Sequence, residues 1–573
     1  MGSITTSDKL TDFGHPMLKH FLLDPNYKNL NHGSYGTFPA VVRDEARKFQ
    51  DELEAKPDLF FRYLQAKYVD VARKELAKVL NAPMNEIVFT KNATTGVNIV
   101  LRNLQYAPGD VIVYFDTVYA ACEKTIAWLM ESTPVQARKV PYSFPTTHEE
   151  IMKRFGEVVK QLRSEGLNVR VALFDTIVSN PGVRFPFEEL VAECRKEGIL
   201  SCVDGAHGVG HIPLDLGKLD ADFFVSNCHK WLYVPRGCAV FHVPIRNQHL
   251  IRTTLPTSHG FVPKNLDVSL PIPKQKGKSD FEFQFEFVAT NDDSPYNCIP
   301  AALKFREEVC GGEERIMSYC QQLAHEGGNT VAEILGTDVM SEPGVDPKVI
   351  GASKIRQCAF ANVRLPLAVD DGSGRHVEKD SQYPVIKRRD AMAVAKWILE
   401  KFLCEYDAAA PIFPHGGWLW TRLSGQTYLE LEDFRWAGNA LKELVERVGK
   451  GDAYAELGIT DVTDDLNAMR LDGTGNQPPP NLPRLQPHLH RSPHKRINTT
   501  KVLIQRQLIP EQNIGNLTLH PKPYLRTGEL PIYPPNLKSR PNAAPTRFRR
   551  ICAASVILGP IFRSIRSGYY IVL

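Results

Sequence analysis

Two neighbouring stretches decide the fold: residues 202–210 read CysValAspGlyAlaHisGlyValGly, and residues 222–232 read AspPhePheValSerAsnCysHisLysTrpLeu. Each stretch contains a short apolar run that is typical of a buried strand. Asp204 ends the first run, and Lys230 follows the second by a few residues. Ligands of open parallel sheets bind outside the carboxyl ends of the strands. The two stretches therefore predict a parallel sheet with a functional site at this edge.

Further strand-like runs alternate with helical patterns between about residues 85 and 245. This alternation predicts an α/β fold with a mostly parallel sheet and helices on both faces. Two helical patterns, at 40–53 and 61–80, precede the sheet. The strand-like runs are Ile87–Thr90, Val111–Phe115, Val169–Asp175, Leu200–Asp204, Phe223–Ser226 and Ala239–Val243.

The chain after the sheet predicts a second, smaller α+β domain. Residues 256–290 are rich in loop formers, and regular patterns return after them. We expect an N-terminal arm (1–30), a large domain (31–300) and a small domain (301–455). The patterns of the small domain are helices at 300–309, 313–335, 390–405 and 428–447 and a strand at 355–363.

The formal net charge of +4 hides a division along the chain. Residues 471–573 carry a net charge of +12 and 15 of the 41 prolines, whereas residues 1–470 carry −8. A Pro-rich basic segment with weak periodicity cannot bury enough apolar area, so we expect a disordered tail. The acidic body is a poor candidate for binding nucleic acid.

The cysteines and the apolar runs exclude several classes of protein. The 11 cysteines include no CxxC pair and no Cys/His cluster with zinc spacing, so no metal site is expected. An odd number of thiols without a signal peptide predicts a cytoplasmic protein. Because no apolar run reaches about 18 residues, no membrane-spanning helix is expected.

Lys230 and Asp204 are the first candidates for chemistry. Lys230 lies beside an apolar strand and a Trp, and burial there favours the neutral amine. A neutral amine can form a Schiff base with a carbonyl cofactor. The Asp204 carboxylate, at a buried strand end, needs a cation, and a protonated pyridine nitrogen would serve. A solvated surface lysine and a helix N-cap aspartate are the alternative interpretations.

A phosphate-binding segment is also predicted. Residues 91–98 read LysAsnAlaThrThrGlyValAsn, follow a strand and open a helix. Small and hydroxyl residues at a helix N-terminus offer N–H groups and the positive end of the dipole to a phosphate. The alternative is an ordinary helix cap.

These motifs resemble the class V aminotransferase-type enzymes, which use pyridoxal 5′-phosphate and have fold type I. The resemblance implies a seven-stranded, mostly parallel sheet. Further motifs resemble the isopenicillin N epimerase-like branch and, more narrowly, the fungal hercynylcysteine sulfoxide lyases of ergothioneine biosynthesis. They lie at 29–39, 114–126, 235–241, 251–262 and 420–430. The resemblance covers about residues 18–450.

The resemblance implies a role for each matching residue around the cofactor. Lys230 would be the Schiff-base lysine and the base for the α-proton, Asp204 would pair with the pyridinium nitrogen, and His207 would lie by the phenolic oxygen. His207 departs from the glutamine usual in the lyases and could equally be a core histidine. The other implied contacts are Thr94, Thr95, Ser226 and His229 to the phosphate, Asn180 to the ring oxygen, and Thr290 to the phosphate of a partner subunit. The Thr290 contact would require a homodimer.

The substrate, a small amino acid, would meet five further residues. Arg422 would clamp its carboxylate, although a surface arginine is the usual alternative. Tyr119 would stack on the ring or donate a proton; otherwise it is a helix-start tyrosine. Asn31 and His32, with Gly33, would line the entrance. Asn180 has its own alternative as a turn residue.

The implied reaction is carbon–sulfur cleavage of a cysteine sulfoxide conjugate, which gives pyruvate and ammonia. Tyr119 could protonate the leaving group. An epimerase is one alternative. A cysteine desulfurase is another, but it needs a nucleophilic cysteine on a mobile loop, and Cys358 lies in a strand-like pattern. A pseudoenzyme would show damage at Lys230 or Asp204, and both are intact. Gly416 and Gly417, before Arg422, are expected to shape the substrate pocket.

Overall fold

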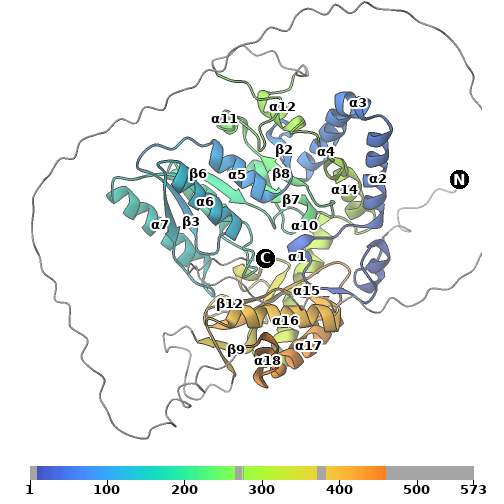
Figure 1. The fold of residues 1–573 in the computed structure, drawn as a ribbon, viewed down its shortest axis with the longest axis vertical. Coiled ribbons are helices and arrows are strands. Elements are labelled where there is room, and N and C mark those ends of the chain that lie inside the picture. Colours follow the sequence, from blue (N-terminus) through green and yellow to red (C-terminus); the bar gives the residue numbers. More distant parts are fainter. Residues whose placement is uncertain (1–9, 265–273, 275–276, 371–382, 460–573) are drawn as a thin grey trace, which may run out of the picture. The chain divides into compact units, whose positions relative to one another are not determined.

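A seven-stranded sheet forms the centre of the large lobe, by which we mean the part of the chain built around this sheet (Figure 1). β8 is antiparallel to both of its neighbours, and the other neighbouring pairs are parallel. The predicted α/β class and the mostly parallel seven-stranded sheet are therefore confirmed. In order across the sheet the strands are β2 (Ile87–Thr90), β8 (Ala239–His242), β7 (Phe223–Asn227), β6 (Leu200–Asp204), β5 (Asn168–Asp175), β3 (Asp110–Phe115) and β4 (Gln136–Val140).

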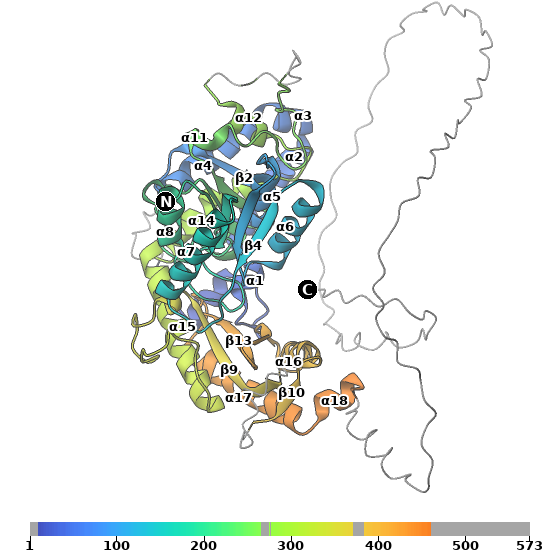
Figure 2. The same ribbon diagram turned by 90° about the vertical axis from the view of Figure 1, so that its left-hand side faces the viewer.

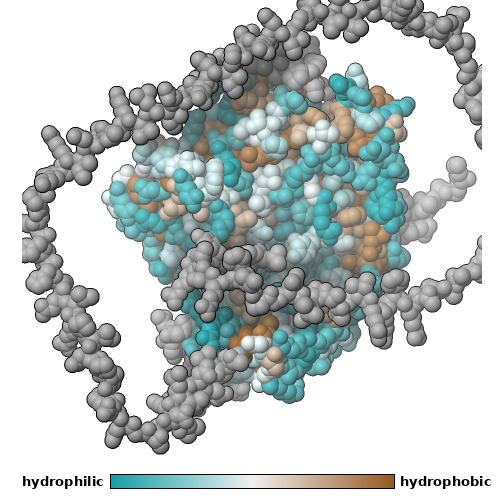
Figure 3. Space-filling model, viewed as in Figure 1, coloured by the Kyte–Doolittle hydropathy of each residue, from teal (hydrophilic) through white to brown (hydrophobic). Residues whose placement is uncertain are grey.

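The computed structural model describes residues 10–264, 274, 277–370 and 383–459. All of these residues belong to one compact unit. The predicted tail, 471–573, lies outside the described residues, as do residues 1–9 of the predicted arm. In the described part of the chain no helix is long and apolar enough to cross a membrane. Polar residues cover most of the face shown in Figure 3, and hydrophobic residues are confined to separate patches.

Helices cover both faces of the sheet, as predicted (Figure 2). Side chains alternate between the faces, so Leu173 packs with one set of helices and Phe174 with the other. The strands are apolar on both faces because both faces are buried. One face carries α5 (Ala93–Asn103) and α6 (Ala120–Ser132), and the other carries α7 (His148–Ser164) and α8 (Phe187–Lys196).

The edge strand β4 has no counterpart among the predicted runs. Its sequence, GlnAlaArgLysVal, has one buried side chain, that of Val140. Edge strands often carry charged residues, because these discourage pairing with another chain. Such a strand lacks the apolar pattern that identified its neighbours.

The small lobe is built on a four-stranded sheet with the order β10-β9-β13-β12 (Figure 1). Its first predicted strand, 355–363, instead begins at Phe360, because Lys354–Arg356 forms the 3-10 turn η5. The helix expected to begin at 428 begins at Leu431, after Glu430 and Asp433 form a capping box. The elements are β9 (Phe360–Asp370), β10 (Val385–Lys387), β12 (Ile412–His415), β13 (Trp418–Ser424), α15 (Glu313–Leu335), α16 (Ala391–Tyr406), α17 (Leu431–Gly449) and α18 (Asp452–Leu457).

One helical prediction before the sheet and one loop prediction after it needed correction. The pattern at 61–80 is a π-helical turn, η3 (Phe60–Leu64), followed by α4 (Gln65–Val79). Within the loop-rich segment, α12 (Asp280–Glu286) forms on a Ser279–Glu282 capping box. The remaining elements are η2 (His15–His20), β1 (Lys28–Asn29), α1 (His32–Tyr35), α2 (Ala40–Ala55), α3 (Pro57–Leu59), η4 (Met84–Glu86), α9 (Leu216–Leu219), α10 (Cys228–Trp231), α11 (Ile245–Gln248), α13 (Ser294–Asn297), α14 (Ile299–Glu308) and β11 (Ala408–Ala409).

Candidate active site

Asp204 lies at the carboxyl end of the central strand β6, where the sequence predicted a functional site. Its side chain is 3% exposed. It accepts hydrogen bonds from the Ala206 N–H at 3.0 Å and from the Cys122 thiol at 3.5 Å. Burial raises its pKa. Among the described residues no cation pairs with this carboxyl group, so the site offers a buried carboxylate to a cationic ligand.

Lys230 lies in α10, directly after strand β7. Its Nζ is 3.1 Å from Nε2 of His207, and the Trp231 indole N–H is 3.4 Å from Nδ1 of the same ring. Because an indole N–H only donates, Nδ1 accepts and the neutral imidazole carries its proton on Nε2. Nε2–H then donates to Nζ, which requires a free electron pair on Lys230. Burial, followed by the charge of Arg422, lowers the pKa of Lys230 to about 8.

The backbone around Lys230 is held from several sides. His32 Nε2 donates to the Lys230 carbonyl at 2.5 Å, and Arg306 donates to the Trp231 carbonyl at 2.8 Å. Gly36 has a φ of +65°, and a Cβ there would lie 1.9 Å from the His229 carbonyl oxygen. Only glycine allows this approach. The turn that carries the lysine is therefore fixed by contacts from α1 and α14.

His32 lies beneath Lys230 and not at the substrate entrance, where it was predicted. Its ring is fully buried, and Nδ1 accepts from the Tyr428 hydroxyl at 2.9 Å. With Nε2 bonded to the Lys230 carbonyl, neither ring nitrogen is free for a ligand. Burial lowers its pKa to about 3. His32 thus supports the lysine turn.

The N-terminus of α5 is organised as the sequence predicted for a phosphate site. The Asn92 side chain caps the helix by accepting from the Thr95 N–H at 2.8 Å. Thr94 and Thr95 occupy the first turn, and α5 is 11 residues long. The first-turn Ala93 N–H donates to Asn227 Oδ1 at 2.8 Å. The positive end of this helix faces the end of β7.

Asn227, and not the predicted Ser226, reaches this helix start. Alternation along β7 places Val225 and Asn227 on the α5 face and Ser226 on the opposite face. Ser226 Oγ accepts from the Val209 N–H at 2.9 Å and donates to the Gly205 carbonyl. Ser226 therefore holds the loop after Asp204. Counting the alternation back from the apolar residues of the strand could have identified Asn227.

Arg422 on β13 is a buried cation. Its side chain is 1% exposed, and its guanidinium donates to the Ser179 carbonyl at 2.5 Å, to Ser34 Oγ at 2.9 Å and to Asn31 Oδ1 at 3.2 Å. It lies over the Phe360 ring, 4.5 Å from the centroid. Its Nε has no hydrogen-bond partner. No described carboxylate pairs with it, and such a group needs an anion.

The other predicted residues occupy the rim. Tyr119 caps the start of α6, one turn before Cys122, and is 48% exposed. Asn180 is exposed in the loop after β5, and Thr290 is exposed on the loop after α12. His229 Nδ1 donates to the Cys238 carbonyl at 3.1 Å, and burial lowers its pKa to about 4.

The family model described as aminotransferase class-V matches residues 38–260. A relative from Epichloe uncinata, the L-cysteine desulfhydrase-like protein lolT1, is 42% identical over 453 residues, which are 78% of this chain and 98% of the relative. The chain belongs to the class V aminotransferase family. The hercynylcysteine sulfoxide lyase of Schizosaccharomyces pombe is 28% identical over 75% of this chain and 97% of the lyase.

A solved structure of the cystine C–S lyase C-DES, in complex with cysteine persulfide, has the same fold. The TM-score is 0.55 with 19% identity, over 73% of this chain and 98% of that chain. This likeness extends the family assignment to the three-dimensional arrangement of the described residues, which is fold type I as predicted.

Membership of the class V family makes pyridoxal 5′-phosphate the cofactor, and the described residues fit it. Asp204 would supply a buried carboxylate for the ring nitrogen, and Lys230 would supply the amine for the Schiff base. The start of α5 suits the phosphate. The protein is therefore a pyridoxal-phosphate enzyme. Four residues that were not predicted lie beside these groups: Asp175 and Cys122 at Asp204, Ser34 at Arg422, and Asn227 at the start of α5.

Proposed function

We propose that this enzyme is a carbon–sulfur lyase that acts on cysteine-derived amino acids. The observation that carries the proposal is the buried Arg422 guanidinium, which pairs with no carboxylate among the described residues and lowers the pKa of Lys230. An arginine near the lysine can bind the carboxylate of a substrate whose amino group reacts at the cofactor, and an amino acid has both groups. The two relatives named above are a cysteine desulfhydrase-like protein and a sulfoxide lyase, which supports the reaction class.

Each residue has a task in this reaction. When bound, the cofactor supplies an electron sink for the pair of electrons left when the α C–H bond breaks. Arg422 holds the substrate carboxylate, and Lys230 Nζ takes the α-proton. Asp204 keeps the positive charge at the ring nitrogen. The β C–S bond breaks, the sulfur leaving group takes a proton from Tyr119, and the three-carbon fragment hydrolyses to pyruvate and ammonia.

The finer proposal is that the substrate is hercynylcysteine sulfoxide, whose sulfenate leaving group gives ergothioneine after a two-electron reduction by an external thiol. The sulfoxide lyase relative supports this choice. The β12–β13 hairpin contacts the loop after β4, where His415 Nε2 donates to the Phe144 carbonyl at 2.9 Å. Gly416 and Gly417 at its tip have φ of +55° and +81°, which favour glycine. This hairpin leads directly to Arg422 and is the wall expected to select the leaving group.

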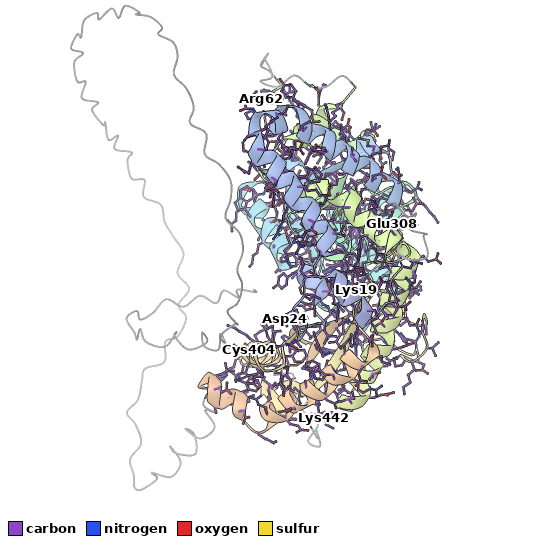
Figure 4. All side chains as sticks on the ribbon, turned by 90° about the vertical axis from the view of Figure 1, so that its right-hand side faces the viewer. Lys19, Asp24, Arg62, Glu308, Cys404 and Lys442 are labelled. Atoms are coloured by element: carbon purple, nitrogen blue, oxygen red, sulfur yellow. The ribbon has the colours of Figure 1, made fainter. Side chains whose placement is uncertain are left out.

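A cysteine desulfurase is disfavoured by the cysteines. Cys358 is 1% exposed, and burial raises its pKa to about 11, so it is a poor nucleophile. Among the described cysteines only Cys404 is exposed, and it lies on helix α16, not on a loop (Figure 4). Epimerisation is distinguished by its product, an inverted α-carbon.

The experiment that tests the proposal is product analysis of the purified full-length protein. Incubation with hercynylcysteine sulfoxide should release pyruvate and ammonia, with a smaller yield from L-cysteine. Lys230→Ala is the negative control. Alanine as the product would indicate a desulfurase, and an inverted substrate would indicate an epimerase. If pyruvate forms from L-cysteine but not from the sulfoxide, the enzyme is a carbon–sulfur lyase and the sulfoxide is not its substrate.

We also propose the assembly and organisation that the sequence suggested. The protein is a cytoplasmic homodimer in which Thr290, exposed on its loop, reaches the partner's phosphate site. Its large domain (31–300) holds the seven-stranded sheet, and its small domain (301–455) holds the four-stranded sheet. Sedimentation should give twice the monomer mass, and Thr290→Ala should weaken cofactor binding. Removal of 471–573 should leave activity unchanged.

A further inference from the structure

Asp175 is a second buried carboxyl group in the site, and the reaction described above does not use it. Its side chain is 5% exposed. In the parallel register of β5 and β6, Asp175 lies opposite Asp204. Neighbouring strands lie about 4.8 Å apart, and residues in register point to the same face of a sheet. Both carboxyl groups therefore lie side by side on the face that carries α5 and α6.

The groups around this pair do not supply two positive charges. In the described chain neither carboxyl forms an ion pair. Asp204 is bonded to two neutral donors, the Ala206 N–H and the Cys122 thiol. Besides Asp204, the titratable groups that act on Asp175 or are affected by it are Cys122 from α6, Lys230 from α10 and Tyr142 from the loop after β4. Lys230 is hydrogen-bonded to His207, and in the described chain it forms no ion pair with either carboxyl group.

Two adjacent buried carboxylates are costly to ionise together, because like charges repel and neither is hydrated. A bound pyridinium ring contributes one positive charge at Asp204, which balances one carboxylate and not two. Burial and the Asp204 charge both raise the pKa of Asp175 well above its usual range. The backbone N–H bond to Asp204 favours ionisation of Asp204. The proton is therefore expected on Asp175.

We propose that Asp175 is a protonated carboxylic acid in the working enzyme and donates a hydrogen bond to Asp204, so that the two groups share one negative charge opposite the cofactor's ring nitrogen. Asp175 is a positioning residue, since it acts through Asp204. Its proton spreads the charge of Asp204 and sets how strongly that carboxylate holds the pyridinium. An amide at position 175 can make the same donation, whereas a methyl group cannot.

The test is an infrared spectrum of the holoenzyme, which does not depend on the identity of the substrate. Wild type should show a carboxylic-acid C=O band that shifts in deuterated water and is lost in Asp175→Asn. Asp433→Asn is the matched control. Asp433 is also buried, but it binds Lys28 at 2.6 Å and its pKa is lowered, so its replacement should remove no such band.

The cofactor dissociation constant gives the second measurement. It should change by less than about threefold in Asp175→Asn and rise by more than about tenfold in Asp175→Ala and Asp204→Asn. Absence of the band from wild type, or cofactor loss in Asp175→Asn equal to that in Asp204→Asn, would show an ionised Asp175 and overturn the proposal. If Asp175→Asn does not fold, wild type labelled with carbon-13 aspartate decides by the presence or absence of the shifted acid band.

Discussion

Nζ of Lys230 lies 3.1 Å from Nε2 of His207, and this hydrogen bond favours the neutral form of the amine. Trp231 donates to the other ring nitrogen, so the proton of the neutral His207 lies between the ring and the lysine. A neutral amine is the form that condenses with a carbonyl group. The lowered pKa of Lys230 therefore suits the proposed condensation with the cofactor.

The pH dependence of cofactor capture follows from this state. The pKa of Lys230 is lowered to about 8, with burial as the largest cause and Arg422 as the second. Below this pH the amine is protonated and cannot condense; above it the free amine dominates. The rate at which apoenzyme takes up pyridoxal 5′-phosphate, followed by absorbance, should rise through about pH 8 and then level off.

The Arg422→Met variant tests whether the Arg422 charge contributes to the lowered pKa of Lys230. Loss of the guanidinium charge removes one cause of the lowered pKa, so the midpoint should move to higher pH. Arg435→Met, at an exposed position on α17, should leave the midpoint unchanged. A midpoint that stays in place in Arg422→Met would show that the two groups do not interact.

Lys230→Ala should lower turnover by a factor on the order of 10²–10⁴, since the base for the α-proton is lost. The absorbance of the bound cofactor should also change, which separates this effect from unfolding. Lys124→Ala, on the exposed side of α6, is the matched control and should behave as wild type. Full turnover of Lys230→Ala with an unchanged spectrum would reject the assignment.

Arg422→Lys should lower kcat/KM by about 10- to 100-fold, because a point charge cannot reproduce a two-pronged bond to a carboxylate. The loss should fall mainly on KM if the carboxylate is held equally before and during the reaction. Arg435→Lys is the control for a general arginine effect. An unchanged KM in Arg422→Lys would place the carboxylate elsewhere.

Asn227→Ala and Ser226→Ala should have different effects, although the residues are adjacent. Asn227→Ala frees the Ala93 N–H at the start of α5, so the dissociation constant of the cofactor should rise by about tenfold. Ser226→Ala removes two bonds to the loop after Asp204 and should lower the free energy of unfolding by about 1–3 kcal/mol. Equal loss of cofactor affinity in both variants would contradict the assignment to opposite faces.

This pair also shows what the sequence could and could not predict. The positions of Asp204 and Lys230 could be predicted because Asp204 ends an apolar run and Lys230 follows one. Such runs are local features of the sequence. The choice between Ser226 and Asn227 depends on the phase of the strand, and an error of one residue reverses the face. The strand was expected to end at 226, but it ends at Asn227.

Local sequence patterns could not predict the contacts between distant segments of the chain. Asp175 was visible as the end of a strand-like run, but its position beside Asp204 depends on the order of strands in the sheet. The bonds of His32 to Lys230 and Tyr428 join residues that are 198 and 396 positions apart. No local spacing encodes such distances, so a role at the entrance was the natural but mistaken placement for His32.

The His32→Ala variant distinguishes a residue that supports the lysine turn from one that contacts the substrate. The variant leaves the Tyr428 hydroxyl and the Lys230 carbonyl without their partner, so the free energy of unfolding should fall by about 1–3 kcal/mol, as measured in urea. KM should change little in the protein that remains folded. Asn31→Ala removes a hydrogen bond to the guanidinium of Arg422. This variant should instead raise KM with little effect on stability.

Acid stability gives an independent measurement of the same residue. The pKa of His32 is lowered from 6.5 to about 3 in the folded protein, so the unfolded state binds this proton first. Its contribution to stability is complete above about pH 6.5 and is lost as the pH falls toward 3. The free energy of unfolding of wild type should therefore fall more steeply below pH 6.5 than that of His32→Ala. The difference in slope should approach about 1.4 kcal/mol per pH unit. Parallel slopes, together with a raised KM, would return His32 to the substrate entrance.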